Sequence, residues 1–473
     1  MESLYTILIS IFLCILLLIF LTRPNYPQNK TPSPCCYPII GNIIAFICNI
    51  HRFHDWVTDM LTSTPTNTLI VHGFLNLSHG ICTANPTNIE HLLRTNFTNY
   101  IKGYRFHDFL HDLLGDGIFI VDDDLWFTQR KIASFEFNTR SLRSFIDQTV
   151  QLKLCESLVP LLGVACEEER IIDMQDVLRR FTFDNVCKLA FGDDPDCLGL
   201  NYDSGSNFVN AFDEAVEICS WRSVSPLQMI WKSKRYFNVG SERRLKELVK
   251  TINDYAMNII RSREENCTAD QQEQDLLSRF MFSDKFVSQD LDQKRKFLRD
   301  IITSFVLAGK DSTSTGLTWL FWILSANPKC QSIIYSELAH LPQVEPGVFS
   351  YEDLKHSNYL HAAISESLRL FPPVPINTRL TVKDDTLPDG TKVKAGWHAD
   401  YSAYAVGRME SVWGADCREF KPERWLDENG EFQPLDPFKF PIFHGGPRMC
   451  LGKEMAYMQM KSIAAAIDFW ICD

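Results

Sequence analysis

The sequence predicts a mainly α-helical protein with a minor β part, preceded by one N-terminal transmembrane helix. Three observations support this fold class. Segments with helical periodicity fill most of the chain between about residues 86 and 370. Short β-like runs flank them, at 68–74, 80–85 and 376–396. Residues 4–21 form an uncharged apolar stretch of 18 residues, about the minimum length that spans the hydrocarbon core of a bilayer.

The N-terminal stretch predicts a membrane anchor over residues 1–22. Glu2 precedes the apolar run, whereas Arg23 and Lys30 follow it, so the positive-inside bias places the body of the chain in the cytosol. A cleaved signal peptide is the alternative, but its basic region and its small-residue cleavage site are missing. Five prolines between residues 24 and 38 then predict an extended linker over residues 23–41.

Composition bounds what the remaining chain can be. The protein has 473 residues, 45% of them hydrophobic, which is enough for one large domain over residues 42–473. The net charge of −12 argues against nucleic acid as a partner. The 15 cysteines are scattered without a C-x-x-C pair, which argues against a zinc ribbon or a redox motif.

The helical pattern can be followed along the chain. It predicts helices at 86–96, 123–146, 149–163, 171–191, 206–217, 241–266, 291–327, 328–340 and 352–370. The polar segment 262–275 is predicted as a surface loop, and 407–441, which carries Pro, Gly and Asp, as coil. A last helix is expected from residue 453 onward.

One segment, Ile301–Asn327, is apolar almost all round and predicts a buried central helix. A second membrane span is the alternative, but Lys310 and Asp311 lie in its middle, where charges are costly. Ala308 and Gly309 remove side-chain bulk from one face.

The residues that follow this small pair add an acid, Asp311, and two hydroxyls, Ser312 and Thr313. This combination predicts a helix opened by a ligand, with a proton path beside it. The alternative is that Gly309 only permits close packing.

Two pairs of residues are weak signals by themselves. Glu366 and Arg369 share a helix face at i and i+3, and Arg424 is a candidate third charge if the pair is buried. Trp126 and Arg130, at i and i+4, share a helix face, where the indole N–H and the guanidinium can both donate to a carboxylate or phosphate. A plain surface pair is the alternative for both.

The stretch FHGGPRMCLG, residues 443–452, places Cys450 just before the last predicted helix. The helix dipole there is expected to lower the thiol pKa and favour thiolate. A held thiolate is either a nucleophile or a metal ligand.

Together, in this order and spacing, these elements resemble the haem-thiolate monooxygenases, the cytochrome P-450 superfamily. The last motif matches at Phe443, Gly446, Arg448, Cys450 and Gly452. The resemblance implies the cytochrome P-450 fold with a long central helix, and haem b as cofactor with Cys450 as the ligand of its iron.

The resemblance also implies roles for the other candidates. Trp126, Arg130 and Arg448 would contact a haem propionate, and Ala308 and Gly309 would give the haem space. Asp311, Ser312 and Thr313 would be the catalytic proton-delivering set. Glu366, Arg369 and Arg424 would form a buried charge network that holds the haem-binding core.

The resemblance narrows to one branch. YIKGYRFHDFLHDLLGDGIFIVDDDLWFTQRKIAS, FDNVCKLAFGDDPDCL and YAVGRMESVWGADCREFKPERWL are similar to plant fatty-acid omega-hydroxylases, including the group that acts on jasmonoyl–amino acid conjugates. This implies a monooxygenase that uses O2 to hydroxylate the omega or near-terminal carbon of a fatty acid or related oxylipin. It also implies an endoplasmic reticulum membrane protein with a cytosolic catalytic domain. The chain has no dinucleotide-binding motif, so an NADPH-cytochrome reductase is the expected electron partner, met by Lys131, Lys421, Lys453 and Lys461.

Three departures from the family pattern stand out. Ser312 occupies a position where the pattern has Thr, and Lys310 replaces the usual Arg. The chain ends at Asp473, before the strand pairs that close the family domain, which predicts missing C-terminal strands. A truncated, non-catalytic remnant is therefore one alternative function. A hydroperoxide isomerase or dehydratase is another, although such enzymes usually alter both the distal acid–hydroxyl pair and the Cys loop, and both are kept here.

Overall fold

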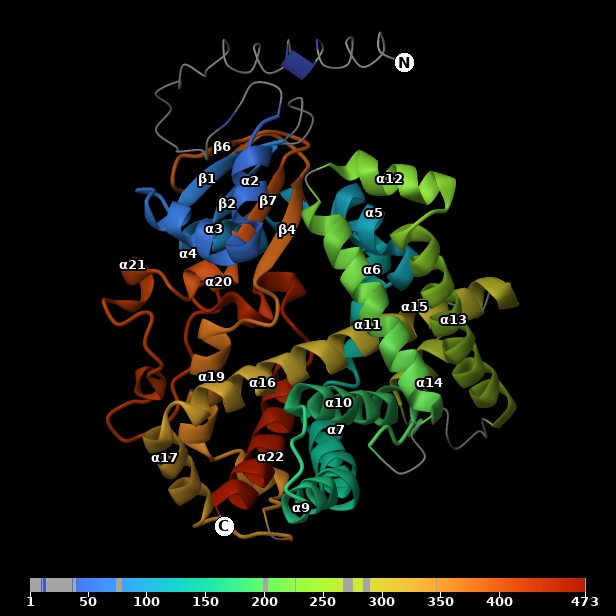
Figure 1. The fold of residues 1–473 in the computed structure, drawn as a ribbon, viewed down its shortest axis with the longest axis vertical. Coiled ribbons are helices and arrows are strands. Elements are labelled where there is room, and N and C mark those ends of the chain that lie inside the picture. The colour runs from blue at the N-terminus through green and yellow to red at the C-terminus, as the bar shows by residue number, and fades with distance from the viewer. Residues whose placement is uncertain are drawn as a thin grey trace.

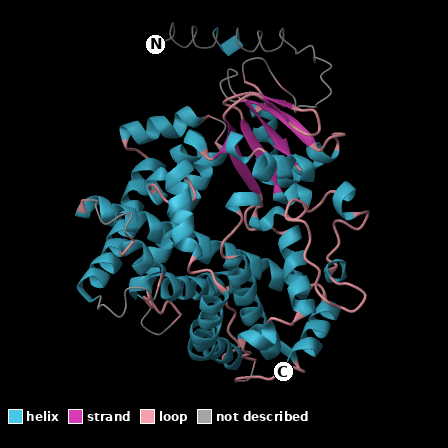
Figure 2. Ribbon diagram, turned by 180° about the vertical axis from the view of Figure 1, so that it is seen from behind, coloured by secondary structure: helices cyan, strands magenta, loops and turns pink. Residues whose placement is uncertain are grey.

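The strands of the protein gather at one edge, and helices form the rest of the body (Figure 1, Figure 2). The computed structural model describes residues 10, 12–13, 36, 40–73, 79–198, 203–225, 227–266, 275–283, 290–345 and 347–472. Most of the predicted anchor over residues 1–22 and most of the predicted linker over residues 23–41 lie outside the described residues. The predicted fold class, mainly α with a minor β part, is confirmed.

A five-stranded sheet joins the two ends of the domain, with strand order β1-β2-β7-β4-β3. Its strands are β1 (Thr68–His72), β2 (His79–Thr83), β3 (Tyr100–Ile101), β4 (Ile376–Thr381) and β7 (His398–Ser402). β1 and β2 pair antiparallel, and β2 pairs parallel to β7. β5 (Asp385–Thr386) and β6 (Lys392–Val393) form a separate pair. The predicted β-runs are therefore strands, and the sheet packs Leu69, Ile81 and Ala399 into a core of its own.

The first half of the chain consists mainly of helices in the part that the structure describes. They are α2 (Ile43–Asn49), α3 (Phe53–Thr62), α4 (Pro86–Glu90), α5 (Gly103–Leu114), α6 (Asp123–Ser134), α7 (Thr139–Ser144), α8 (Gln151–Lys153), α9 (Val159–Glu167), α10 (Met174–Phe191), α11 (Asp203–Val224) and α12 (Gln228–Phe237), with the π-helical segments η3 (His91–Thr95), η5 (Phe145–Val150) and η6 (Leu154–Leu158) and the 3-10 turns η1 (Ile50–Arg52) and η4 (Phe97–Asn99).

The second half contains the central helix and the helices that pack on it. They are α13 (Ser241–Asn266), α14 (Leu276–Met281), α15 (Leu291–Val306), α16 (Ser312–Ser325), α17 (Pro328–Leu338), α18 (Tyr351–Leu354), α19 (Asn358–Leu370), α20 (Ala403–Val406), α21 (Glu410–Trp413) and α22 (Lys453–Cys472), with the π-helical segment η8 (Leu307–Asp311) and the 3-10 turns η9 (Pro422–Trp425), η10 (Pro441–Phe443) and η11 (Gly446–Arg448).

The central helix runs from α15 through η8 into α16 and crosses the body (Figure 1). The predicted helix over 291–327 is confirmed, with a widened π-helical segment in its middle. Residues of α16 pack with α19 and α22 in one core, and residues of α15 pack with α11 and α13 in another. The central helix therefore joins the two main cores, and η8 lies where they meet.

Several predicted boundaries are wrong. The break predicted between 146 and 149 lies instead at 135–138, where the Asn138 side chain caps α7 by accepting from the backbone N–H groups of Arg140 and Ser141. From there the chain stays helical to Glu167, through η5 and η6. The predicted helix 352–370 is split, because Ser357 and its neighbours turn the chain between α18 and α19. Helices α2, α3, α5, α12, α14, α20 and α21 were not predicted, and α21 lies within the predicted coil 407–441.

One helical run among the described residues, Thr139–Glu167, is long and apolar enough to cross a membrane. Its inward side, with Phe145, Ile146 and Leu154, packs into the core beside α10 and α22. We therefore interpret this run as a helix that packs against the core of the domain with one face.

Candidate haem-thiolate site

The loop before α22 presents Cys450. Its backbone N–H donates to the Phe443 carbonyl at 2.8 Å, which closes the turn. Gly446 has φ +64°, and a Cβ there would lie 2.1 Å from the Leu93 carbonyl oxygen, so only glycine fits this position. Gly452 is less constrained, since a Cβ would lie 3.3 Å from the ring of Phe137. The loop thus holds Cys450 by backbone geometry, and the residue keeps solvent-accessible surface although protein atoms surround its thiol.

The expectation that the helix start lowers the Cys450 pKa is wrong for the protein alone. Desolvation by the surrounding protein atoms raises the pKa of the thiol, against the opposing effects of the Gly452 backbone N–H and of the positive charges of Arg130 and Lys453. Burial therefore outweighs the dipole here. A bound cation would reverse the balance, because a metal-coordinating thiol is deprotonated outright.

The predicted propionate-binding residues come together beside this loop. Arg448 lies over the Trp126 ring, with its guanidinium carbon 4.4 Å from the ring centroid, and donates to Asp122 at 2.7 Å and to the Val121 carbonyl at 2.8 Å. Arg130, one turn after Trp126 on α6, donates to the Met449 carbonyl at 2.5 Å. The two segments are thereby joined on one side of Cys450.

Sequence reasoning missed three further residues of this group. Lys102, Arg379 and His444 are close enough to Arg448 to share its electrostatic field. Lys102 and Arg379 are buried, although they lie far apart in the sequence. Pairing of Tyr100 with Thr381 and of Ile101 with Leu380, between β3 and β4, brings them to one place.

This cluster carries more positive than negative charge. Burial and the charge of Arg379 lower the pKa of Lys102 well below its usual value and that of His444 likewise. The same two causes lower the pKa of Arg448 to about 10. Among the acceptors described there, Asp122 is the carboxylate that faces Arg448.

Arg379 is only partly satisfied, because its Nη1 donates to the Thr378 carbonyl at 3.0 Å but two of its other nitrogens find no acceptor in the described part of the chain. Its Nε and Nη2 atoms are buried without a hydrogen-bond partner among the described residues. Buried, unpaired guanidinium groups are costly. The cluster therefore fits an anionic group with more than one acceptor oxygen, and haem propionates have that chemistry.

On the other side, η8 opens the central helix at the predicted small residues. Ala308 and Gly309 lie inside η8. A Cβ on Gly309 would lie 2.5 Å from Val186 Cγ2 of α10, so this glycine does permit close packing, as the alternative reading held. The helix is nevertheless widened here, and the Lys310 carbonyl accepts from Thr182 at 3.0 Å and from Ser314 at 2.8 Å. Side chains thus satisfy backbone groups of the opened turn.

The two candidate hydroxyls differ. The Ser312 hydroxyl donates to the Ala308 carbonyl at 2.7 Å, across the opened turn. Thr313 is buried on the next position round the helix. The Ser312 oxygen keeps its acceptor capacity, because the hydroxyl hydrogen is used for Ala308.

Asp311 is tied to a charged chain that leads outward. One of its carboxylate oxygens pairs with the fully buried Lys310, which also pairs with Asp213. Asp213 in turn binds Arg179 at 2.7 Å. The other Asp311 oxygen is buried without a hydrogen-bond partner in the part of the chain that the structure describes, and burial raises the pKa of Asp311.

A cleft of about 470 Å³ adjoins this chain. It is lined by Arg179, Asn210, Asp213, Glu214, Val216, Glu217 and Asp311. Lys310 stands where the family pattern has Arg. Because it pairs with Asp311, this departure does not leave the Asp311 carboxylate unpaired.

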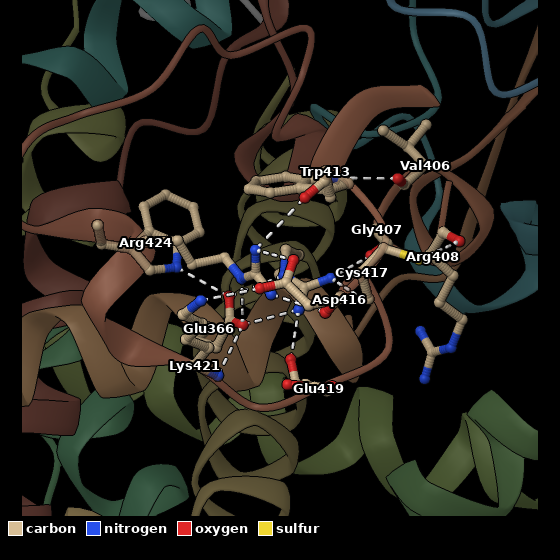
Figure 3. Close-up of polar contacts among 12 residues, drawn as sticks. Glu366, Val406, Gly407, Arg408, Trp413, Asp416, Cys417, Glu419, Lys421 and Arg424 are labelled. Carbon is tan, nitrogen blue, oxygen red and sulfur yellow. Dashed lines mark hydrogen bonds and ion pairs between the residues drawn. The ribbon is translucent and has the colours of Figure 1, made fainter. Parts of the chain in front are cut away.

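The predicted charge network is present and buried. Glu366 and Arg369 have no exposed surface, and they form two hydrogen bonds of 2.7 Å. Glu366 also accepts from Arg424 at 2.9 Å, from Trp425 Nε1 at 2.9 Å and from the Lys421 backbone at 3.0 Å (Figure 3). The third charge is therefore Arg424, as predicted.

Arg369 and Arg424 extend this network to the coil that leads to the Cys450 loop. Arg369 donates to the carbonyls of Gly407, Cys417 and Glu419. Arg424 binds Asp416 through its carboxylate at 2.9 Å and its carbonyl at 2.7 Å. The network ties together residues 407–425, a largely irregular segment in which α21 and η9 are the regular parts.

The prediction that Lys461 lies on the surface that meets the redox partner is wrong. Lys461 is buried in α22, and its ammonium donates to the Leu354 carbonyl at 2.9 Å. Lys131 and Lys421 are exposed, and Lys453 is half-buried beside the Cys450 loop.

The sequence of this chain is similar to those of known proteins. The family model described as Cytochrome P450 matches residues 32–467. Cytochrome P450 CYP94D108 of Paris polyphylla is 46% identical over 450 residues, which cover 93% of this chain and 87% of that protein. Cytochrome P450 94A1 of Vicia sativa is 43% identical over 460 residues, covering 94% and 87%. Cytochrome P450 94B1 of Arabidopsis thaliana is 41% identical over 480 residues, covering 99% and 92%.

Proposed function

This chain belongs to the cytochrome P450 family of haem-iron monooxygenases, and from that premise we propose that it hydroxylates the omega or near-terminal carbon of a fatty acid or related oxylipin. The observation that carries the proposal is the family match over residues 32–467, which includes the Cys450 loop, the opened central helix and the buried charge network. The substrate class rests on the similarity of three long segments to plant fatty-acid omega-hydroxylases.

We propose haem b as the cofactor. Cys450 would supply the thiolate ligand to its iron, and Lys102, Arg130, Arg379 and Arg448 would neutralise its propionates. When bound, thiolate-ligated haem iron supplies the cleavage of the O–O bond of O2. The unpartnered Nε and Nη2 atoms of Arg379 support this assignment.

The residues of η8 and α16 would manage protons. Asp311 has a raised pKa and one carboxylate oxygen without a partner among the described residues, so it is suited to take a proton at that oxygen and release it. Ser312, whose oxygen remains an acceptor, would hold a proton donor such as water in line. Thr313 is the second candidate for this role. The cleft beside Asp213 and Asp311 offers water access to this set.

Electrons come from a redox partner, and we propose a separate NADPH-cytochrome reductase. Lys131 and Lys421 are exposed and Lys453 is half-buried beside the Cys450 loop, so an acidic patch on the reductase would find complementary charge there. We also propose that the N-terminal apolar stretch anchors the chain in the endoplasmic reticulum membrane with this domain in the cytosol, as the positive-inside bias indicates.

The retained Cys450 loop and the acid–hydroxyl pair favour a monooxygenase over a hydroperoxide isomerase or dehydratase. The test is to supply membranes containing the full chain with the reductase, NADPH, a fatty acid and isotopically labelled O2. The proposal predicts a labelled hydroxyl at or near the terminal carbon, formed only with NADPH, and no product from Cys450→Ala. Conversion of a fatty-acid hydroperoxide without NADPH, and no labelled alcohol, would contradict it.

A further inference from the structure

A cluster of two histidines and one aspartate lies outside the haem-thiolate site, at the end of α5. His107 and His111 are one turn apart on the same face of this helix, and Asp116 follows the helix end. Each histidine Nε2 lies 3.8 Å from Asp116 Oδ1. All three ligand atoms lie within 4.8 Å of one another.

The position of Asp116 is set by its backbone. Gly115 ends α5 with φ +52°, and a Cβ there would lie 2.1 Å from the Asp300 carboxylate, so the chain turns back only because this residue is glycine. The Asp116 N–H donates to Asp300 of α15 at 2.8 Å. Its carbonyl accepts from Gln129 of α6 at 2.8 Å. Two elements thus hold Asp116 in place and leave its carboxylate facing the histidines.

The distances suit a shared ion better than direct contacts. A separation of 3.8 Å is too long for a hydrogen bond. With metal–ligand bonds of about 2.0–2.1 Å, two ligands of a tetrahedral site lie ~3.3 Å apart, so small side-chain rotations would suffice. The two imidazole rings already lie with centroids 4.2 Å apart and planes 30° apart.

The charges around the cluster and the exposure of its three side chains also fit a bound metal ion. The other carboxylates of α5 are neutralised by cations, since Asp108 pairs with Lys232 and Asp112 with Arg222 and Arg235. The three side chains of the cluster are between 35% and 46% exposed, so an ion and its waters have access.

We propose that His107, His111 and Asp116 form a binding site for a first-row divalent metal ion, with Zn²⁺ as the reference ion. Two imidazoles and one carboxylate suit Zn²⁺, Ni²⁺, Co²⁺ or Cu²⁺, whereas Mg²⁺ and Ca²⁺ prefer oxygen ligands alone. A bound ion clips the last turn of α5 to residue 116 and, through it, to α6 and α15. The site is therefore structural, and it is independent of the proposed function.

The test is equilibrium titration of the purified, chelator-treated full-length protein with Zn²⁺. Cysteine thiols elsewhere in the chain also bind this ion, so the informative quantity is the difference in bound Zn²⁺ between variants. Wild type should bind one more Zn²⁺ than His107→Ala/His111→Ala. Asp116→Asn should weaken that site by about tenfold or more, since one of three protein ligands is lost. His340→Ala, at an exposed histidine beyond α17, is the matched control and should bind as wild type does.

A second readout is Co²⁺ absorption in the visible range. The proposal predicts a signal of nitrogen and oxygen ligation that the double variant lacks, while the haem spectrum of both proteins stays the same. Equal Zn²⁺ stoichiometry in wild type and double variant, or equal Co²⁺ spectra, would overturn it. Mg²⁺ binding with the same affinity as Zn²⁺ would also overturn it.

Discussion

Arg369→Met should unfold or strongly destabilise the protein, because the change breaks the centre of the buried charge network. The guanidinium gives two hydrogen bonds to Glu366 and three to backbone carbonyls. Glu366 keeps three other donors, from Arg424, Trp425 and Lys421. The carboxylate is therefore only partly orphaned, whereas the carbonyls of Gly407, Cys417 and Glu419 each lose this donor.

The magnitude follows from these two losses. Removing one partner of a buried ion pair costs about 3–5 kcal/mol, and a buried carbonyl left without a donor costs about 1–3 kcal/mol. The partial compensation at Glu366 lowers the first figure, and the three carbonyls raise the total again. We therefore expect a loss of about 4 kcal/mol or more, against a native stability on the order of 5–15 kcal/mol.

The assay is urea unfolding of the full-length protein in detergent, followed by far-ultraviolet circular dichroism, together with the haem content per chain. Arg243→Met is the matched control, because Arg243 is 68% exposed and pairs only along the helix surface, where such a pair contributes little. Arg369→Lys, which keeps the charge but loses the planar fork, should fall between the two. If Arg369→Met is as stable as Arg243→Met, the network does not hold residues 407–425.

Three further outcomes are expected. Gly309→Ala should destabilise the fold by about 1–3 kcal/mol through overpacking against Val186, and Val186→Ala, which removes the nearest Val186 atom but keeps its Cβ, should restore part of that loss in urea unfolding; no rescue would contradict the close-packing account. Ser312→Ala should lower product formed per NADPH consumed, and Ser312→Thr should raise it, because Thr has fewer side-chain rotamers in a helix; unchanged coupling in both, measured by NADPH and product assays, would leave Ser312 as a packing residue. Burial raises the pKa of Asp184 to about 6, so the folded state keeps the proton of this carboxyl to higher pH than the unfolded state does. The stability of wild type relative to Asp184→Asn should therefore fall by about 3 kcal/mol as pH rises from about 4 through 6. A pH-independent difference in urea unfolding would refute the last assignment.

The local periodicity of the sequence was enough to predict much of this fold. The strongly amphipathic helix α13, Ser241–Asn266, has the predicted bounds. The apolar run with small residues in its middle became the central helix with its opened turn. By contrast α5 was missed, although Phe106, Leu110 and Leu113 repeat with helical spacing, because the acids and histidines between them lowered its apparent hydrophobicity.

Long-range contacts could not be read from local pattern. Lys102 and Arg379 meet only through the pairing of β3 with β4, and nothing near either residue indicates that pairing. The Cys450 pKa was predicted with the wrong sign because the helix dipole is visible in the sequence and burial is not. Lys461 was expected at the surface because of its charge, yet it serves to satisfy backbone carbonyls inside the core.

The central claim is that Cys450 is the thiolate ligand of haem iron, and one measurement tests it most directly. The reduced carbon-monoxide difference spectrum of the full-length protein, purified in detergent, should show the band typical of thiolate-ligated haem. Cys450→Ala should lose that band even where haem is retained, whereas Cys166→Ala, at an exposed cysteine on α9, should keep it. A thiolate-type spectrum in Cys450→Ala, or its absence from the haem-loaded wild type, would contradict the account.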